Sequence, residues 1–129
     1  MGISGGIASA VASTLAAKTK KRVLCLEMPI HQQSDQINRA KDHINWLKKK
    51  FNNVSSILLD LEETYEHFKK TLINNAHSET HEIALVNSRA RLRMTTLYYY
   101  AQLNNYLVLG TGNKAVSYTH LTLPTKRIV

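Results

Sequence analysis

The sequence predicts an α/β fold built on a doubly wound, Rossmann-like parallel sheet. Short runs of branched apolar residues alternate with longer runs, and in the longer runs apolar residues recur every three or four positions. A glycine-rich turn precedes the first of the longer runs. The chain has 129 residues, of which 43% are hydrophobic, so it is large enough for one small globular domain.

The first half of the chain should contain two helices and one strand after the glycine turn. Residues 9–18 are small and read as a helix with Ser9 near its start, and Arg22–Met28 reads as a strand that a proline ends. A second helix should run from Ser34 or Asp35, which are good N-cap residues, to about Phe51. Its apolar positions form one stripe: Ile37, Ala40, Ile44, Leu47 and Phe51.

The second half should contain two strands and two helices. Ser56–Asp60 is expected as a short strand, and a helix should follow with apolar positions at Leu61, Tyr65, Phe68 and Leu72. A polar loop over residues 74–80 leads to the longest helix, at about His81–Leu103. Its expected buried stripe is Ile83, Val86, Ala90, Met94, Leu97 and Ala101.

The last predicted strand is Tyr106–Leu109. Its continuous apolar character is typical of a strand that is buried on both faces of a parallel sheet. Residues 110–114 would form the loop at its carboxyl end, where α/β sheets place their ligands.

The segment Gly2–Ser9 is a candidate phosphate-binding loop. Glycines between a strand position and a helix let backbone N–H groups converge on an anion, and the helix dipole favours negative charge there. The segment is neither a Walker pattern nor the dinucleotide pattern G-x-G-x-x-G. A glycine turn without a ligand is the alternative reading.

Read as S-G-G-x-D-S without its aspartate, this loop resembles the pyrophosphate loop of enzymes that cleave ATP to AMP and pyrophosphate. Three further segments narrow the resemblance: Met28-Pro29 with His31 and Gln33–Asp35, the run Asn87–Met94, and the run Leu109–Lys114. In this order and spacing, residues 2–115 resemble the ammonia-dependent NAD synthetases. GMP synthetases and tRNA thiolation enzymes share only the loop and remain alternatives.

The resemblance implies a fold like that of the adenine nucleotide α-hydrolases, with strand order 3-2-1-4-5. It also implies an enzyme that uses ATP, ammonia and Mg²⁺ to amidate deamido-NAD to NAD, through an adenylylated intermediate. No side chain acts as a nucleophile in that chemistry. The family is expected to be cytoplasmic and homodimeric, without a nucleic-acid or membrane partner.

The same resemblance assigns roles to individual residues. Arg91 matches the position that binds deamido-NAD, whereas Arg89 and Arg93 lie on the other flank of the helix and suit a solvated or dimer-contact role. The ATP-binding positions fall at Gly2, Ile3, Ser4, Gly5, Gly6, Ile7, Ala8, Ser9 and Thr111, with the hydroxyls of Ser4 and Ser9 as donors to pyrophosphate.

The chain departs from the family pattern at both magnesium ligands. Ala8 stands where the loop has an aspartate, and Val116 stands where a glutamate is expected. A genuine substitution and a one-base sequencing error both account for Ala8. Residues 116–129 resemble the translation of a transposon-end sequencing adapter, and an authentic β-rich tail is the alternative.

We therefore expect residues 1–115 to be a partial NAD synthetase domain, truncated at both ends. The strand that precedes the loop in the family would be central in the sheet, and only Met1 remains of it. Its absence would leave a gap or force the sheet to pair differently.

Other functions are less well supported by composition. The net charge of +8 allows a small basic nucleic-acid-binding protein, but the basic residues are scattered along the chain. No apolar run is long enough to span a membrane. The six histidines form no metal-binding pattern and are expected to be solvated, and Cys25, in an apolar run, is expected as a buried free thiol.

Overall fold

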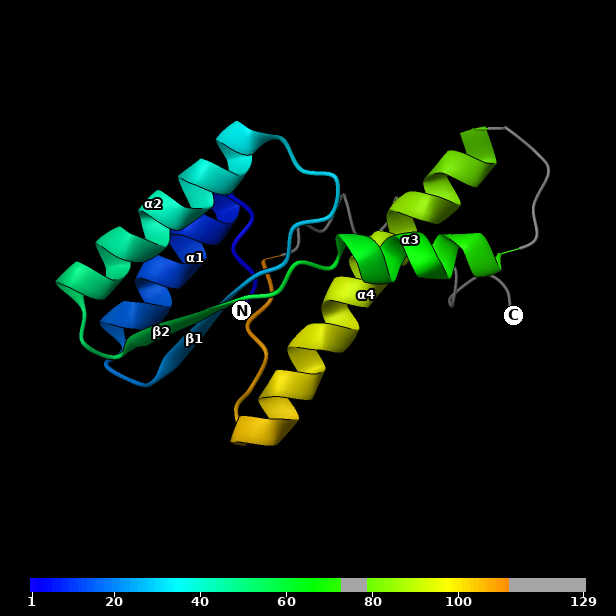
Figure 1. Ribbon diagram of the computed structural model, residues 1–129. Helices are drawn as coiled ribbons and strands as arrows, with labels where there is room; N and C mark the ends of the chain where they lie inside the picture. Colours follow the sequence, from blue (N-terminus) through cyan, green and yellow to red (C-terminus); the bar gives the residue numbers. More distant parts are fainter. Residues whose placement is uncertain (73–78, 112–129) are drawn as a thin grey trace.

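A computed structural model describes residues 1–72 and 79–111 of the chain (Figure 1). Within these residues, helices and short strands alternate in the first part of the chain, and two helices follow one another in the second. The elements are α1 (Ile7–Lys18), β1 (Val23–Glu27), α2 (Ser34–Lys50), β2 (Val54–Leu58), α3 (Glu62–Thr71) and α4 (Glu79–Asn104).

The sheet confirms the predicted α/β class with parallel strands. β1 and β2 pair in parallel, with Val23 opposite Val54 and Glu27 opposite Leu58. The first residues of the chain run along the other edge of β1, where Gly2 forms a parallel bridge with Leu26. This arrangement agrees with the first part of the expected order, in which the glycine loop leaves the strand next to β1.

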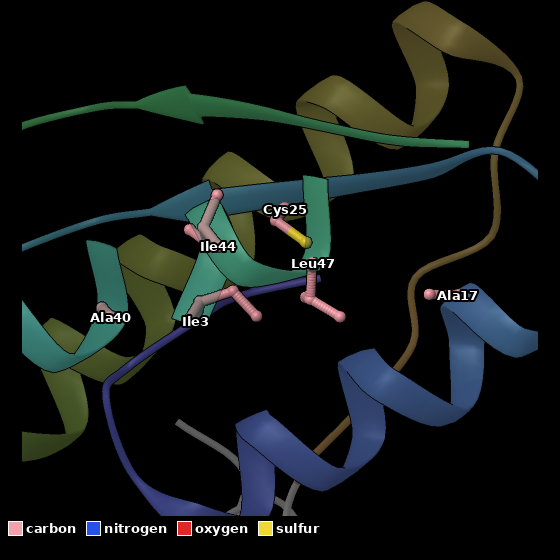
Figure 2. Close-up of a cluster of buried hydrophobic side chains, with 6 residues drawn as sticks. All are labelled: Ile3, Ala17, Cys25, Ala40, Ile44 and Leu47. Atoms are coloured by element: carbon pink, nitrogen blue, oxygen red, sulfur yellow. The ribbon is translucent and has the colours of Figure 1, made fainter. Parts of the chain in front are cut away.

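One hydrophobic core lies between the sheet and the helix pair α1 and α2 (Figure 2). α2 lies beside α1 on the same face of the strands (Figure 1). The buried members of this core are Ile3, Ala17, Cys25, Ala40, Ile44 and Leu47. The stripe predicted for α2 is therefore confirmed at its three central positions, and Cys25 is a buried free thiol whose pKa is raised by burial.

A second, smaller core joins α3 to α4. Ile30, Tyr65 and Leu85 are buried in it, with Leu61 and Leu92 packed against them. Within the described residues this core is small, because only three of its residues are buried.

The stripe predicted for α4 is wrong. Ile83, Val86 and Met94 are each more than 40% exposed, and Ala90 is exposed as well. The buried positions of α4 are instead Leu85 and Asn87. The predicted stripe does form one apolar face of α4. Among the described residues, however, α3 and the segment after β1 pack against a different face of this helix. Of the apolar positions that marked α3, Tyr65 is buried, whereas Phe68 and the C-cap residue Leu72 are exposed over more than two fifths of their surface.

The strand predicted at Tyr106–Leu109 is not formed either. These residues are extended without ladder hydrogen bonds, and the side chain of Leu107 is 97% exposed. In Figure 1 the segment passes close to the amino end of the chain. A strand needs a hydrogen-bonded neighbour, and within residues 1–72 and 79–111 the edge of β1 opposite β2 pairs with Met1–Ile3 alone.

No helix in the described part of the chain is long and apolar enough to cross a lipid bilayer. Val116 and the segment 116–129 lie outside the described residues, so the expectations for them stay predictions.

We predict that Leu47→Ala lowers the free energy of unfolding by about 2–5 kcal/mol, because Leu47 is fully buried between α2 and the sheet. Leu58→Ala is the matched control, since Leu58 is 52% exposed, and should cost less than about 1 kcal/mol. Urea denaturation followed by circular dichroism measures both. Equal losses would show that the core lies elsewhere.

Candidate phosphate-binding site

The glycine loop begins where the chain leaves the edge of β1. The N–H of Ile3 donates to the carbonyl of Leu26 at 2.9 Å, and the side chain of Ile3 is buried in the core. This residue, predicted among the ATP-binding positions, therefore uses its N–H in the sheet and orients the loop. The residues after it emerge at the carboxyl end of a parallel strand, the usual ligand edge of an α/β sheet.

Gly5 lets the loop approach α2 closely. Its φ is +86°, a backbone conformation that residues with a side chain rarely adopt. A Cβ atom there would lie 2.4 Å from the carbonyl oxygen of Gln36. The Nε of Arg39 donates to the carbonyl of Gly5 at 3.3 Å. The loop is thus seated on the first turns of α2, which fixes the direction in which it enters α1.

The two serines of the loop hold its shape. Ser9, which is almost fully buried, donates from Oγ to the carbonyl of Gly6 at 3.1 Å and accepts the N–H of Ser4 at 3.3 Å. The hydroxyls of Ser4 and Ser9 are 3.3 Å apart, and Ser4 Oγ accepts the N–H of Gly6. Sequence reasoning assigned both hydroxyls to pyrophosphate. In this structure they bond within the loop, so a ligand would have to take over some of these bonds.

The amino end of α1 offers free backbone donors. The helix begins at Ile7 with Gly6 as its N-cap, two residues earlier than predicted. Its first helical bond runs from Ala10 to Gly6, so the N–H groups of Ile7, Ala8 and Ser9 have no partner within the helix. The first turn contains no acidic residue. This end of the helix is therefore suited to a phosphate group, which the exposed Ile7 and Ala8 side chains leave accessible.

The described residues do not fit the magnesium ion that the sequence resemblance implied. Ala8 is exposed in the first turn of α1, and its methyl group has no atom able to bind a cation. In residues 1–72 and 79–111 no group of three or more His, Cys, Asp or Glu residues is placed to hold a metal ion. What this part of the chain provides is hydrogen-bond donation to an anion.

Arg89 and Arg93 anchor α4, which corrects the expectation that they are solvated; the alternative of a dimer contact stays a prediction. Arg93 donates from Nε to the carbonyl of Met28 at 3.0 Å, and its pKa is lowered by burial and further by the nearby charge of Arg89. Arg89 donates to the hydroxyl of Tyr65 at 3.2 Å and stacks over its ring. These contacts tie α4 to α3 and to the carboxyl end of β1.

Arg91 differs from both of these neighbours. It is half-buried, and within the described part of the chain its guanidinium forms no hydrogen bond or ion pair. Asn87 lies one helical turn earlier on the same face and is buried, and its Oδ1 has no hydrogen-bond partner there. A free guanidinium beside an unsatisfied amide oxygen suits a polar ligand that can serve both.

Sequence reasoning did not single out Glu27. Its Oε1 is buried without a partner among the described residues, at the carboxyl end of β1. An acid at the end of an apolar strand was the available signal.

Thr111 is exposed outside regular structure, and the structure gives it no hydrogen bond to the glycine loop.

Two of the histidines expected to be solvated have protein partners. His31 lies between the carboxylates of Glu62 and Glu66, with a distance of 3.1 Å from Nδ1 to Glu62. His43 Nε2 is 2.8 Å from the hydroxyl of Ser13, and its pKa is lowered by burial. The His31 contacts join the loop after β1 to α3, and the His43 contact joins α2 to α1.

A glycine loop at the carboxyl edge of a parallel sheet, followed by a helix with free N–H groups, defines the class of α/β phosphate-binding proteins. The chain belongs to the NAD synthase family, whose model matches residues 1–122. It is 40% identical over 114 residues to the NH(3)-dependent NAD(+) synthetase of Mesoplasma florum, and 39% identical over 115 residues to that of Carboxydothermus hydrogenoformans. These matches cover 88% of this chain but only 44% and 45% of the relatives, so the chain spans less than half of their length.

Solved structures show the same fold. The structure of NMN synthetase from Francisella tularensis matches 87% of this chain with a TM-score of 0.72 and 34% sequence identity. NAD+ synthetase from Burkholderia pseudomallei matches with a TM-score of 0.63 at 23% identity, which supports the fold. This chain covers 44% and 54% of those two structures.

We predict that Gly5→Ala destabilises the protein by roughly 1–3 kcal/mol, because a Cβ there meets backbone of α2 and φ is positive. Gly110→Ala is the matched control, since a Cβ at Gly110 has no atom within 4 Å, and it should leave stability nearly unchanged. Thermal unfolding measures both variants. Equal stability of the two would mean that the loop is not seated on α2.

Proposed function

We propose that the complete protein is an ammonia-dependent synthetase that amidates deamido-NAD to NAD at the expense of ATP. Membership of the NAD synthase family carries this proposal. The glycine loop and the unpaired Arg91 are the structural features that support it, because they supply separate places for a polyphosphate and for a second anionic substrate. Since this chain spans less than half of its relatives, the activity belongs to the completed protein.

The proposed reaction has two steps. A carboxylate oxygen of deamido-NAD attacks the α-phosphorus of ATP, a P–O bond forms, and pyrophosphate leaves with the electrons of the broken P–O bond. Ammonia then attacks the carbonyl carbon of the adenylylated intermediate, AMP leaves, and the nitrogen gives up a proton to yield the amide. Neither step needs a side-chain nucleophile, so positioning and charge stabilisation supply the catalysis.

The described residues serve this reaction by binding and orientation. The N–H groups at the start of α1 stabilise the charge that develops on pyrophosphate, and the serine bonds keep the loop ready for it. Arg91 would pair with an anionic group of the dinucleotide, and Asn87 would hold it through a hydrogen bond. The cation of ATP has no ligand at Ala8, so these residues do not supply its binding.

The exposed apolar face of α4 supports a homodimer of the completed protein. Ile83, Val86 and Met94 lie on this face, and each is more than two fifths exposed. Exposed apolar surface of this kind often marks a site of protein–protein contact. We assign the complete protein to the cytoplasm, where its ATP and dinucleotide substrates would be available.

The resemblance to NMN synthetase favours a second candidate within the same chemistry. The TM-score and the sequence identity of that structure are both higher than those of NAD+ synthetase from Burkholderia pseudomallei. Its substrate class would be a mononucleotide, with the same attack of a pyridine carboxylate on ATP. A direct competition between deamido-NAD and nicotinate mononucleotide, with the completed protein and ammonia, decides between the two.

The experiment that tests the proposed function compares three proteins for ammonia- and ATP-dependent formation of NAD. They are this chain, its Ala8→Asp variant, and a protein completed at both ends that also carries Ala8→Asp. We expect activity only in the third, because the loop alone cannot supply the missing cation ligands or the rest of the fold. Activity in the unmodified chain would show that other residues bind the cation of ATP. Inactivity of all three proteins toward both nucleotides would refute the proposed synthetase function.

We predict that Arg91→Ala in the active completed protein weakens deamido-NAD binding by roughly 1.5–3 kcal/mol, the scale of a hydrogen bond to a charged group. Its affinity for ATP should change much less, because the loop that holds the phosphates lies on α1 and not on α4. Isothermal titration with each substrate separates the two effects, and Arg22→Ala, at an exposed position remote from the loop, is the control. Equal weakening of both substrates would contradict the assignment.

A further inference from the structure

The carbonyl of Met28 lies where the sheet stops and the glycine loop begins. In a parallel ladder, alternate residues bond to opposite neighbours. Accordingly, Glu27 at the end of β1 accepts the N–H of Leu59 on the β2 side. Leu26, one residue earlier, accepts the N–H of Ile3 on the side of the loop. Met28 is the next residue on the loop side, so its carbonyl needs a donor from that side.

The glycine loop does not supply this donor. Since a parallel ladder advances by two residues on each strand, the donor after Ile3 would be the N–H of Gly5. Gly5 instead has a φ of +86° and lies against α2, so the chain has already left the sheet. Met28 is only 6% exposed, and a buried carbonyl without a donor would destabilise the fold.

Arg93 of α4 provides the donor in place of the loop. Its Nε donates to the carbonyl of Met28 at 3.0 Å. The side chain of Met28 in turn contacts the start of the loop, because a Cβ atom on Gly2 would lie 3.2 Å from its Cε. Arg93 is therefore connected to the loop through a single residue.

The bond to Met28, and no ion pair, holds the guanidinium of Arg93 in place. Among the described residues, neither Arg93 nor Arg89 is paired with a carboxylate. The two arginines lie four residues apart on α4, and like charges at this spacing repel each other. Burial and the charge of Arg89 both lower the pKa of Arg93. The position of Arg93 thus depends on the direction of one Nε–H bond.

We propose that Arg93 is a positioning residue for phosphate binding: its Nε replaces the strand donor that the glycine loop withdraws, and so fixes where the loop leaves the sheet. Because Arg91 lies two residues earlier on the same helix, this bond also sets the place of Arg91 relative to the loop. The role rests on the proposed function in one respect, which is that the loop binds the phosphates of ATP.

Arg89 is the matched control for this role. It donates to the hydroxyl of Tyr65 at 3.2 Å and stacks over that ring, so its partner lies on α3 and not on the strand beside the loop. It has the same charge as Arg93 and lies one helical turn away. An effect of charge or of α4 anchoring should therefore appear at both arginines, whereas an effect on the loop should appear at Arg93.

The first measurement uses the unmodified chain, labelled with ¹⁵N and studied by NMR. The Nε–H signal of Arg93, assigned by its loss in Arg93→Lys, should exchange with water about tenfold or more slowly than that of the exposed Arg22, because it is hydrogen-bonded. Equally fast exchange of the two signals would overturn the proposal, and this result does not depend on the stability of any variant.

Three variants then separate position from charge. Arg93→Lys keeps the charge, Arg93→Met removes it, and Arg89→Met removes the charge one turn away. Both Arg93 variants should shift the amide signals of Gly5 and Gly6 and weaken the binding of inorganic pyrophosphate about fivefold, the scale of one hydrogen bond. Arg89→Met should do neither. The affinity is measured on the signals of folded molecules, so a loss of stability alone would not change it.

The outcomes distinguish this role from the proposed function. If Arg93→Lys binds pyrophosphate like the unmodified chain while both methionine variants bind weakly, charge is the cause and the proposal is overturned. Unshifted Gly5 and Gly6 signals in both Arg93 variants overturn it too. If the unmodified chain does not bind pyrophosphate, the phosphate site of the proposed function is contradicted. The Gly5 and Gly6 signals then still decide whether Arg93 positions the loop.

Discussion

The hydrogen bonds between Met1–Ile3 and β1 determine where everything around the candidate site lies. They are few: Met1 and Ile3 bond to Leu24 and Leu26. They nevertheless bring the start of the chain into the sheet, place the glycine loop at the carboxyl edge of a parallel strand, and direct α1 back across one face. Without them the loop would still be rich in glycine, but its N–H groups would have no fixed direction, and a phosphate site requires that direction.

The sequence predicted best the elements whose pattern is complete within one segment. The centre of the α2 stripe was predicted correctly because Ala40, Ile44 and Leu47 lie on one face of the helix and pack into the same core beside the sheet. The glycine loop was found because Gly5 needs a positive φ and a close approach to α2, which few other residues allow. In both cases one short segment shows the constraint, although the partner lies elsewhere in the chain: the sheet for α2, and Gln36 for Gly5.

The errors share a non-local cause. Whether Ile83 or Leu85 of α4 is buried depends on which face meets α3, and whether Tyr106–Leu109 becomes a strand depends on a partner far away in sequence. Arg93 illustrates this best, because its Nε satisfies the carbonyl of Met28, 65 residues earlier, and no helical periodicity reports that bond. Helical angles placed Arg93 on the flank away from Arg91 but said nothing of what lay against that flank.

In the candidate site, the residues that shape the loop differ from the residue at position 8, where a carboxylate would add negative charge. Gly5, Ser4 and Ser9 form its bends and internal hydrogen bonds, whereas Ala8 is exposed and takes no side-chain part in them. Position 8 can therefore change from a carboxylate to a methyl group without disturbing the backbone, since alanine is also the better helix former. An intact loop therefore fits membership of the family but does not show catalysis. The charge that catalysis needs at this position comes from a side chain that the fold of the loop does not require.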